Sequence, residues 1–278
     1  MPIILDGKAL AAKRKMELAQ KVKGLSRKPG LAVILVGDNP ASKVYVTSKR
    51  KDCEECGYYS EEYTLPGETA EKQLLDLIQV LNRRADIDGI LVQLPLPKHM
   101  DEKKVLLAIS PEKDVDGFHP MNVGKLMTGE AGFLPCTPAG VMELLAEHNI
   151  DPAGKHCVVV GRSNIVGKPM AMLMLRKDAT VTICHSKTPN LPEVCRRADI
   201  LVAAVGKTGI IAADMVKEGA VVVDVAMNRD ADGKLCGDCD RAVYEKSSAF
   251  TPVPGGVGPM TRAVLMENTF LAAVEHGA

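Results

Sequence analysis

Residues 156–170 combine a β-branched run, two glycines and a helix start in one short segment. The run Cys157–Val160 is apolar and suits a buried parallel strand. Gly161 ends it with a tight turn, Gly167 lets the backbone approach a ligand, and Lys168-Pro169 begins a helix, because proline is favoured in a first turn. Such a turn presents N–H groups to an anion, so the segment predicts a phosphate-binding site. The Gly-x5-Gly spacing is not the usual fingerprint, and the glycines can also serve turn geometry alone.

The end of the next strand, 179–184, indicates which dinucleotide would bind. The strand is followed by His185-Ser186-Lys187-Thr188, with no acidic residue. An NAD site usually places Asp or Glu here to bind the ribose 2′-OH, and such a carboxylate would repel a 2′-phosphate. Arg162, Ser186 and Lys187 would instead attract that phosphate. The sequence therefore predicts NADP as cofactor.

Alternating strands and helices run through both halves of the chain. Strands are expected at 31–36, 58–64, 89–94, 200–205 and 220–224, and helices at 7–23, 69–84, 137–148, 191–197 and 212–217. Residues 110–138 hold many Gly and Pro and indicate a long ordered loop, and residues 228–234 a polar turn.

This alternation predicts an α/β fold with two lobes and a cleft between them. We expect an N-terminal α/β substrate domain over 1–138, joined by the C-terminal helix 260–278. A Rossmann-like parallel-sheet NADP domain is expected over 139–259.

Composition excludes several classes of protein. The 278 residues are 46% hydrophobic and 25% charged, with 35 basic and 35 acidic side chains, as in an ordinary soluble α/β protein. A balanced charge argues against a nucleic-acid binder and a polybasic membrane anchor. No apolar run approaches the roughly 20 residues that span a bilayer, and no signal-peptide pattern is present. We expect a cytoplasmic protein.

Cysteine spacing raises the question of a metal. Cys53-x-x-Cys56 and Cys236-x-x-Cys239 have the spacing of zinc ligands. The two pairs fall in different predicted domains, and the first pair also fits an apolar helix face. We therefore expect no metal.

Lys49 lies at an unusual position on a predicted helix. Asn39-Pro40 begins this helix as N-cap and N1, and Gly57 ends it. Tyr45, Lys49, Cys53 and Cys56 share one face, which should point inward. A lysine among apolar neighbours has its neutral form favoured by desolvation and is often catalytic. The alternative is a lysine whose stem packs while its ammonium reaches water.

Two further polar groups are candidates for the same site. Gln93 interrupts the apolar run at the carboxyl end of a predicted strand, where ligands of α/β proteins gather. Asp116 lies in the acidic turn Asp114-Val-Asp116-Gly117. Gln93 can instead bond to backbone, and the aspartates can serve an Asx turn.

Together these segments resemble the bifunctional methylenetetrahydrofolate dehydrogenase/methenyltetrahydrofolate cyclohydrolase family over residues 2–274. The resemblance is carried by the segments 45–53, 89–97, 111–117, 161–167 and 251–261. It implies that Lys49 is the catalytic lysine and that Gln93 supports it. It implies substrate contacts from Tyr45, Asp116, Pro254, Gly255 and Gly256. It implies an NADP site lined by Gly161, Arg162, Ser163, Ser186 and Met227. The chain departs from the family at two places. The family usually has Gly-Ile-Asn where this chain has Ala226-Met227-Asn228, and Gly-Asp-Val where this chain has Gly237-Asp238-Cys239.

The implied chemistry suits these residues. Hydride loss from a methylene carbon between two nitrogens leaves a cation that needs no base. Hydrolysis of that cation needs proton transfers, and a cationic substrate would push Lys49 towards its neutral form.

Three further expectations complete the sequence reading. A homodimer is expected from the resemblance, with the region 228–250 offering a strand edge for pairing. Another two-lobed NADP dehydrogenase, such as a shikimate-dehydrogenase-like enzyme, is the alternative activity. A non-catalytic NADP-sensing protein would need neither Lys49 nor Asp116.

Overall fold

The computed structural model describes residues 1–278, with side chains at all positions except 40 and 41. The chain divides into two compact units. Unit 1 contains Met1–Ala11 and Pro135–Thr261, and unit 2 contains Ala12–Leu134 and Arg262–Ala278. Residues 1–11 therefore group with the C-terminal part of the chain, whereas the sequence placed them in the N-terminal domain. The reason is that Ile3–Ile4 forms a strand of the unit 1 sheet.

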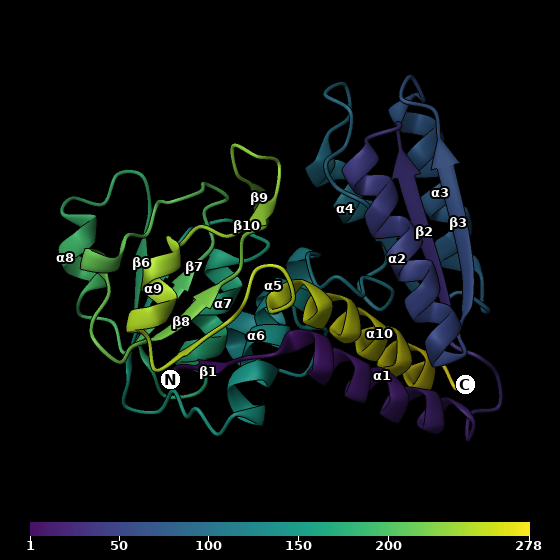
Figure 1. Ribbon diagram of the computed structural model, residues 1–278. Coiled ribbons are helices and arrows are strands. Elements are labelled where there is room, and N and C mark those ends of the chain that lie inside the picture. The colour runs from purple at the N-terminus through teal and green to yellow at the C-terminus, as the bar shows by residue number, and fades with distance from the viewer. The chain divides into compact units, whose positions relative to one another are not determined.

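Unit 1 is built on a six-stranded sheet in the order β1-β11-β8-β7-β5-β6 (Figure 1). All of its strand pairs are parallel. The strands are β1 (Ile3–Ile4), β5 (His156–Val160), β6 (Thr180–Cys184), β7 (Ile200–Ala203), β8 (Val221–Asp224) and β11 (Ala249–Phe250). The chain order reverses at β5, which has β6 on one side and β7 on the other. The predicted Rossmann-like parallel sheet is confirmed, and its topological switch point lies between β5 and β7.

Short helices and one hairpin complete unit 1. They are α6 (Cys136–Glu147), α7 (Gly167–Leu175), α8 (Leu191–Cys195), the 3₁₀ turn η1 (Ala213–Met215), α9 (Arg241–Lys246) and the antiparallel pair β9 (Asn228–Arg229) with β10 (Leu235–Cys236). The helix expected at 212–217 is thus only one 3₁₀ turn. The turn expected at 228–234 closes the β9–β10 hairpin. Strand β11 lies between β1 and β8, so within the region 228–250 only the β9–β10 hairpin has unpaired strand edges.

Unit 2 is built on a three-stranded parallel sheet in the order β3-β2-β4. The strands are β2 (Gly30–Val36), β3 (Tyr59–Leu65) and β4 (Gly89–Val92), and its own helices are α2 (Pro40–Cys56), α3 (Glu71–Arg83), α4 (Glu102–Ala108) and α5 (Pro120–Thr128). Two long helices, α1 (Gly7–Val22) and α10 (Val257–Glu275), have residues in both units. Ala32, Ile34 and Val36 on one face of β2 pack with α3 and α4, and α2 contacts β2 and β3 (Figure 1).

The segment 110–138 is not the continuous loop expected from the sequence. Helix α5 lies within it, with His119 accepting a hydrogen bond from Met121 N at 3.1 Å and proline at the first helical position. Gly129 ends the helix in the left-handed region at φ 84°. Its capping signals are ordinary, but nine residues with one internal glycine show too little periodicity to be found from the sequence. No helix among the described residues is long and apolar enough to cross a membrane.

Candidate functional site

Helix α2 presents Lys49 near the carboxyl end of the unit 2 sheet. Asn39 Oδ1 accepts a hydrogen bond from Ser42 N at 3.2 Å, which confirms its predicted role as N-cap. Along the predicted face, Cys53 and Cys56 are fully buried, Lys49 is half-buried and Tyr45 is 38% exposed. The face is therefore anchored at its C-terminal end and opens to solvent towards Tyr45. Burial raises the pKa of Tyr45.

The Lys49 ammonium and the Gln93 amide meet at the end of β4. Lys49 Nζ donates to Gln93 Oε1 at 2.9 Å, and Gln93 Nε2 donates to Leu94 O at 2.8 Å. Gln93 N donates to Ile34 O at 2.8 Å, so the sheet ladder also holds the residue by its backbone. The structure thus brings together two residues that the sequence marked 44 positions apart. Gln93 therefore bonds both to the backbone, which was the alternative expected from the sequence, and to the lysine.

A buried ion cluster one turn beyond Lys49 holds α2 in place. Asp52 is 1% exposed and accepts hydrogen bonds from Lys15 Nζ and Arg262 Nη1, both at 2.6 Å. Arg262 Nη1 also contacts Ser48 O at 3.3 Å, directly before Lys49. The sequence gives no sign of this cluster, because all three residues look like ordinary surface charges.

The two aspartates of the acidic turn differ in burial: Asp114 is buried and Asp116 is half-buried. Asp114 is 2% exposed and accepts from Phe118 N at 3.2 Å, His119 N at 2.7 Å and Asn122 Nδ2 at 2.8 Å. Burial raises the pKa of Asp114 to about 6, although these donors oppose the shift. Asp114 therefore organises the turn. Asp116 is only half-buried, so it is the aspartate of the pair that a ligand can reach.

The glycines of the first βα turn in unit 1 are required by close packing of the backbone. A Cβ on Gly161, at φ +137°, would lie 2.3 Å from Ala204 O, and a Cβ on Gly167 would lie 2.3 Å from Gly161 O. The absence of a side chain at Gly167 thus allows its backbone to approach that of Gly161 closely. Ser163 Oγ accepts from Val166 N at 3.1 Å and from Gly167 N at 3.3 Å. Gly161 and Ser163 fix the shape of the turn at the start of α7.

The side chains around this turn are exposed and carry no acid. Arg162, Ser186 and Lys187 are exposed at the ends of β5 and β6, and Met227 is 43% exposed after β8. The four positions 185–188 contain no Asp or Glu. This edge of the sheet can therefore hold an anionic dinucleotide with a 2′-phosphate.

The Pro254-Gly255-Gly256 segment meets the first turn of α1 within unit 1. Gly255 O accepts from Lys8 N at 2.9 Å, and a Cβ on Gly7 would lie 1.7 Å from Gly256 O. A Cβ on Gly256 would lie 2.7 Å from Pro252 O. These glycines serve close backbone packing, and Pro254 itself is exposed.

Two buried carboxylates behind the same sheet edge escaped the sequence analysis. Asp224 is 1% exposed and accepts from Asp238 N and Cys239 N at 2.9 Å and from Tyr244 Oη at 2.8 Å. Desolvation by burial raises the pKa of Asp224. Asp238 is fully buried and accepts from three backbone N–H groups and from Asn228. The signal available in the sequence was Asp224 at a strand end and Asp238 after a glycine, which also fits a turn.

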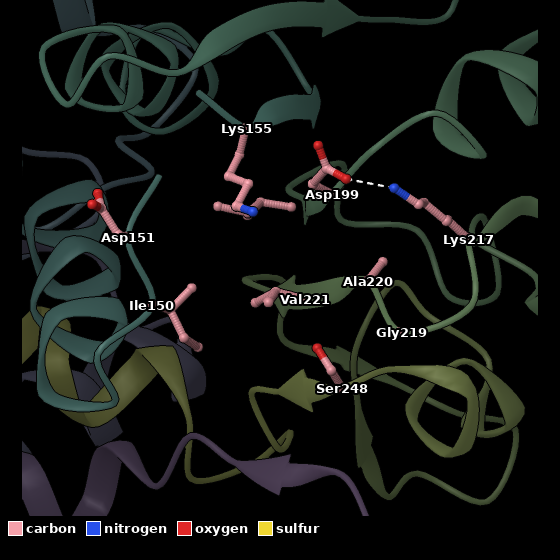
Figure 2. A pocket seen from close by; sticks show the side chains of 10 residues that line it. Ile150, Asp151, Lys155, Asp199, Lys217, Gly219, Ala220, Val221 and Ser248 are labelled. Carbon is pink, nitrogen blue, oxygen red and sulfur yellow. Dashed lines mark hydrogen bonds and ion pairs between the residues drawn. The ribbon is translucent and has the colours of Figure 1, made fainter. Parts of the chain in front are cut away.

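One cavity in unit 1 lies at the opposite edge of the sheet (Figure 2). It has a volume of about 220 Å³ and is lined by residues that precede β5, β7, β8 and β11, among them Lys155, Asp199, Lys217 and Ser248. Figure 2 shows the ion pair between Asp199 and Lys217 at its rim. Ligands of doubly wound sheets bind at the carboxyl ends of the strands, so this amino-end cavity is not the candidate site.

A metal centre is not indicated by the side chains that the structure describes. Within that set, no group of three or more His, Cys, Asp or Glu is placed to hold an ion. Cys53 and Cys56 belong to unit 2, and Cys236 and Cys239 belong to unit 1.

Two family models match the chain. The model described as tetrahydrofolate dehydrogenase/cyclohydrolase, catalytic domain, matches residues 5–116. The model described as tetrahydrofolate dehydrogenase/cyclohydrolase, NAD(P)-binding domain, matches residues 135–277.

Individual relatives agree with these models over nearly the whole chain. The bifunctional protein FolD of Ruminiclostridium cellulolyticum is 62% identical over 275 residues, covering 98% of this chain and 97% of the relative. The structure of FolD methylenetetrahydrofolate dehydrogenase/cyclohydrolase from Campylobacter jejuni aligns with a TM-score of 0.96 at 52% identity, covering 99% of both chains. The Trypanosoma brucei methylenetetrahydrofolate dehydrogenase-cyclohydrolase, solved with NADP and an inhibitor, aligns with a TM-score of 0.94 at 37% identity, covering 99% of this chain and 98% of that one.

Proposed function

The chain belongs to the tetrahydrofolate dehydrogenase/cyclohydrolase family, and on this premise we propose that Lys49, supported by Gln93, transfers the protons of the cyclohydrolase step. The protein is a bifunctional enzyme. It oxidises 5,10-methylenetetrahydrofolate with NADP⁺ to the 5,10-methenyl cation and NADPH. It then adds water to that cation, which gives 10-formyltetrahydrofolate and a proton.

The observation that carries this assignment is the hydrogen bond from Lys49 Nζ to Gln93 Oε1 at 2.9 Å. A neutral amide accepts this bond without adding the negative charge that would fix the lysine as an ammonium. The cationic substrate disfavours a second positive charge beside it and therefore favours the neutral amine. A neutral amine can take a proton from the attacking water, and the resulting ammonium can return one when the ring opens.

In the dehydrogenase step the protein has to bind and orient the folate and NADP⁺, and no base is needed. NADP⁺, when bound, accepts the hydride. We propose that the turn formed by Gly161, Arg162 and Ser163 holds its pyrophosphate at the start of α7. Ser186 and Arg162 would bind the 2′-phosphate, and Met227 would pack against the nicotinamide. The fit is supported by the basic, acid-free surface after β5 and β6.

Folate binding is proposed for Tyr45, Asp116 and the segment Pro254-Gly255-Gly256. The ring of Tyr45 is 38% exposed one helical turn before Lys49, so it is available to stack on a flat heterocycle. Asp116 is a half-buried carboxylate that can accept hydrogen bonds from pterin N–H groups. In unit 1 we propose folate contacts from Pro254, Gly255 and Gly256. The tight packing of this segment provides a rigid backbone.

The test measures NADPH formation and methenyl hydrolysis on the same purified protein, as wild type and as Lys49→Met. Methionine keeps the apolar stem and removes the amine. We expect cyclohydrolase activity to fall by roughly 10²–10⁴-fold, with NADPH still formed and methenyl product accumulating. Lys51→Met, at an exposed position of the same helix, is the control and should keep both activities. Unchanged hydrolysis in Lys49→Met would show that the lysine only packs its stem.

We further propose that the enzyme is a homodimer in the cytoplasm. Ile3 and Ile4 are 52% and 55% exposed on β1 at one edge of the unit 1 sheet, and β6 forms the other edge. Exposed strand edges and apolar side chains favour association. All eight cysteines are free thiols, as is usual for a protein of a reducing compartment. A monomer mass in light scattering at micromolar concentration would contradict the dimer.

A further inference from the structure

Three consecutive backbone N–H groups in the loop after β7 are directed at one carboxylate. Val205 N and Gly206 N donate to Asp238 Oδ2 at 2.6 and 3.1 Å, and Lys207 N donates to Asp238 Oδ1 at 2.7 Å. Gly206 adopts φ +79°, which lets the successive N–H groups converge. Such a concavity of N–H groups, called a nest, binds anions. Here the anion is a fully buried side chain of the same chain.

The same carboxylate also holds the segment after β8. Asn228 Nδ2 donates to Asp238 Oδ1 at 2.9 Å and to Gly237 O at 3.1 Å. Asn228 directly follows Met227, which is 43% exposed and is a proposed cofactor contact. Asp238 therefore joins two segments, 205–207 and 226–228, that leave neighbouring strands β7 and β8.

Both segments border the edge where the cofactor is proposed to bind. Strand β7 pairs with β5, and a Cβ on Gly161 would lie 2.3 Å from Ala204 O, so the loop after β7 abuts the first βα turn. Because Asp238 has no exposed surface, it cannot touch a cofactor itself. Because its oxygens occupy the nest, the N–H groups of residues 205–207 do not compete with the βα turn for phosphate.

We propose that Asp238 is a positioning residue for the dehydrogenase reaction: it fills the nest at 205–207 and fixes the loop and Met227 in the shape that receives the nicotinamide half of NADP. This inference rests on the proposed binding of NADP at the carboxyl edge of unit 1. It assigns Asp238 no part in the hydrolysis of the methenyl compound, which consumes no cofactor.

The test is Asp238→Asn, assayed for both activities of the enzyme. The asparagine keeps one acceptor oxygen but turns an N–H₂ group towards N–H donors, so part of the nest is vacated. We expect the KM for NADP⁺ to rise about ten-fold or more, because a smaller fraction of molecules then keeps the loop in its cofactor-binding shape, while cyclohydrolase activity measured without NADP is unchanged. Asp199→Asn is the matched control, since Asp199 lies at the opposite edge of the sheet (Figure 2) and should leave the KM unchanged.

A second variant decides the question if Asp238→Asn does not fold. Asn228→Ala removes only one side-chain donor and leaves the three backbone hydrogen bonds in place, so a smaller rise in the KM for NADP⁺ is expected, again with hydrolysis retained. An unchanged KM in a folded variant, or an equal loss of both activities, would overturn the proposal. Failure of the proposed function itself would be seen separately, as absence of NADPH formation by the wild-type enzyme.

Discussion

Lys49 and Gln93 are joined by a hydrogen bond whose direction is set by a third group. Gln93 Nε2 donates to Leu94 O at 2.8 Å, and this leaves Oε1 facing the Lys49 ammonium at 2.9 Å. The strand end thus selects which end of the amide the lysine meets. The lysine receives an acceptor that is polar and uncharged, which is the property that a proton-transfer group needs in a neighbour.

Gln93→Glu should shift the pH dependence of the cyclohydrolase rate. The side chain keeps its size, but the carboxylate favours the charged form of Lys49. The cyclohydrolase rate should therefore reach half of its maximum at a higher pH than in the wild type. Gln93→Leu, which removes the acceptor without adding charge, should not shift the profile upwards. An identical profile for wild type and Gln93→Glu would argue that the two side chains do not interact during turnover.

Arg162→Ala should weaken NADP more than NAD. The arginine's proposed partner is the 2′-phosphate, which NAD lacks, and a charge-assisted hydrogen bond contributes about 1.5–3 kcal/mol. The preference for NADP, measured as the ratio of the two kcat/KM values, should fall roughly ten-fold or more. Equal losses with both cofactors would mean that Arg162 only shapes the turn.

Gly167→Ala should destabilise unit 1. The new Cβ would lie 2.3 Å from Gly161 O, so either backbone must move, at a cost of about 1–3 kcal/mol. Gly124→Ala is the matched control in helix α5, where no atom lies within 4 Å of a Cβ, and it should stabilise its helix by about 0.5–1 kcal/mol. Thermal melts of both variants test the pair. A Gly167→Ala protein as stable as the wild type would show that the turn relaxes freely.

Asp114→Asn should alter how stability depends on pH. Burial raises the pKa of Asp114 from 3.8 to about 6, so below about pH 4 both the folded and the unfolded chain hold the proton. Between these values only the unfolded chain ionises, and the contribution of Asp114 to stability falls as the pH rises. The loss amounts to up to about 3 kcal/mol and remains above pH 6. The difference in unfolding free energy between variant and wild type should therefore move in favour of the variant from pH 4 to 6. A constant difference across this range would show that Asp114 is ionised in the folded protein.

The elements predicted correctly from the sequence are those whose burial requires an unbroken run of apolar residues. The strands β2, β5 and β8 are buried on both faces, so they appear as unbroken apolar runs whose ends lie within a residue or two of the expected ones. Lys49 and Gln93 were visible because each is a polar group in an apolar context.

The parts that were missed depend on contacts between distant residues. Strand β1 has two residues and exists only because it pairs with β11, nearly 250 positions away. Asp52 and Asp238 resemble surface or turn residues until the partners that bury them are known. The close approach of Gly167 to the carbonyl of Gly161 cannot be seen in the sequence either.

The pairing of Ile3–Ile4 with Ala249–Phe250 has a consequence for synthesis. During translation, β1 leaves the ribosome long before β11 has been synthesised. Ile3 and Ile4 therefore have no strand to pair with during this time. The sheet of unit 1 can be completed only after almost the whole chain has emerged. The edge strand β1 is synthesised first but can join the sheet only last. A loop of nearly 250 residues must close before this edge is stabilised. We therefore expect chains that end before residue 249 to leave the segment Ile3–Ile4 accessible, and chains that include β11 to protect it.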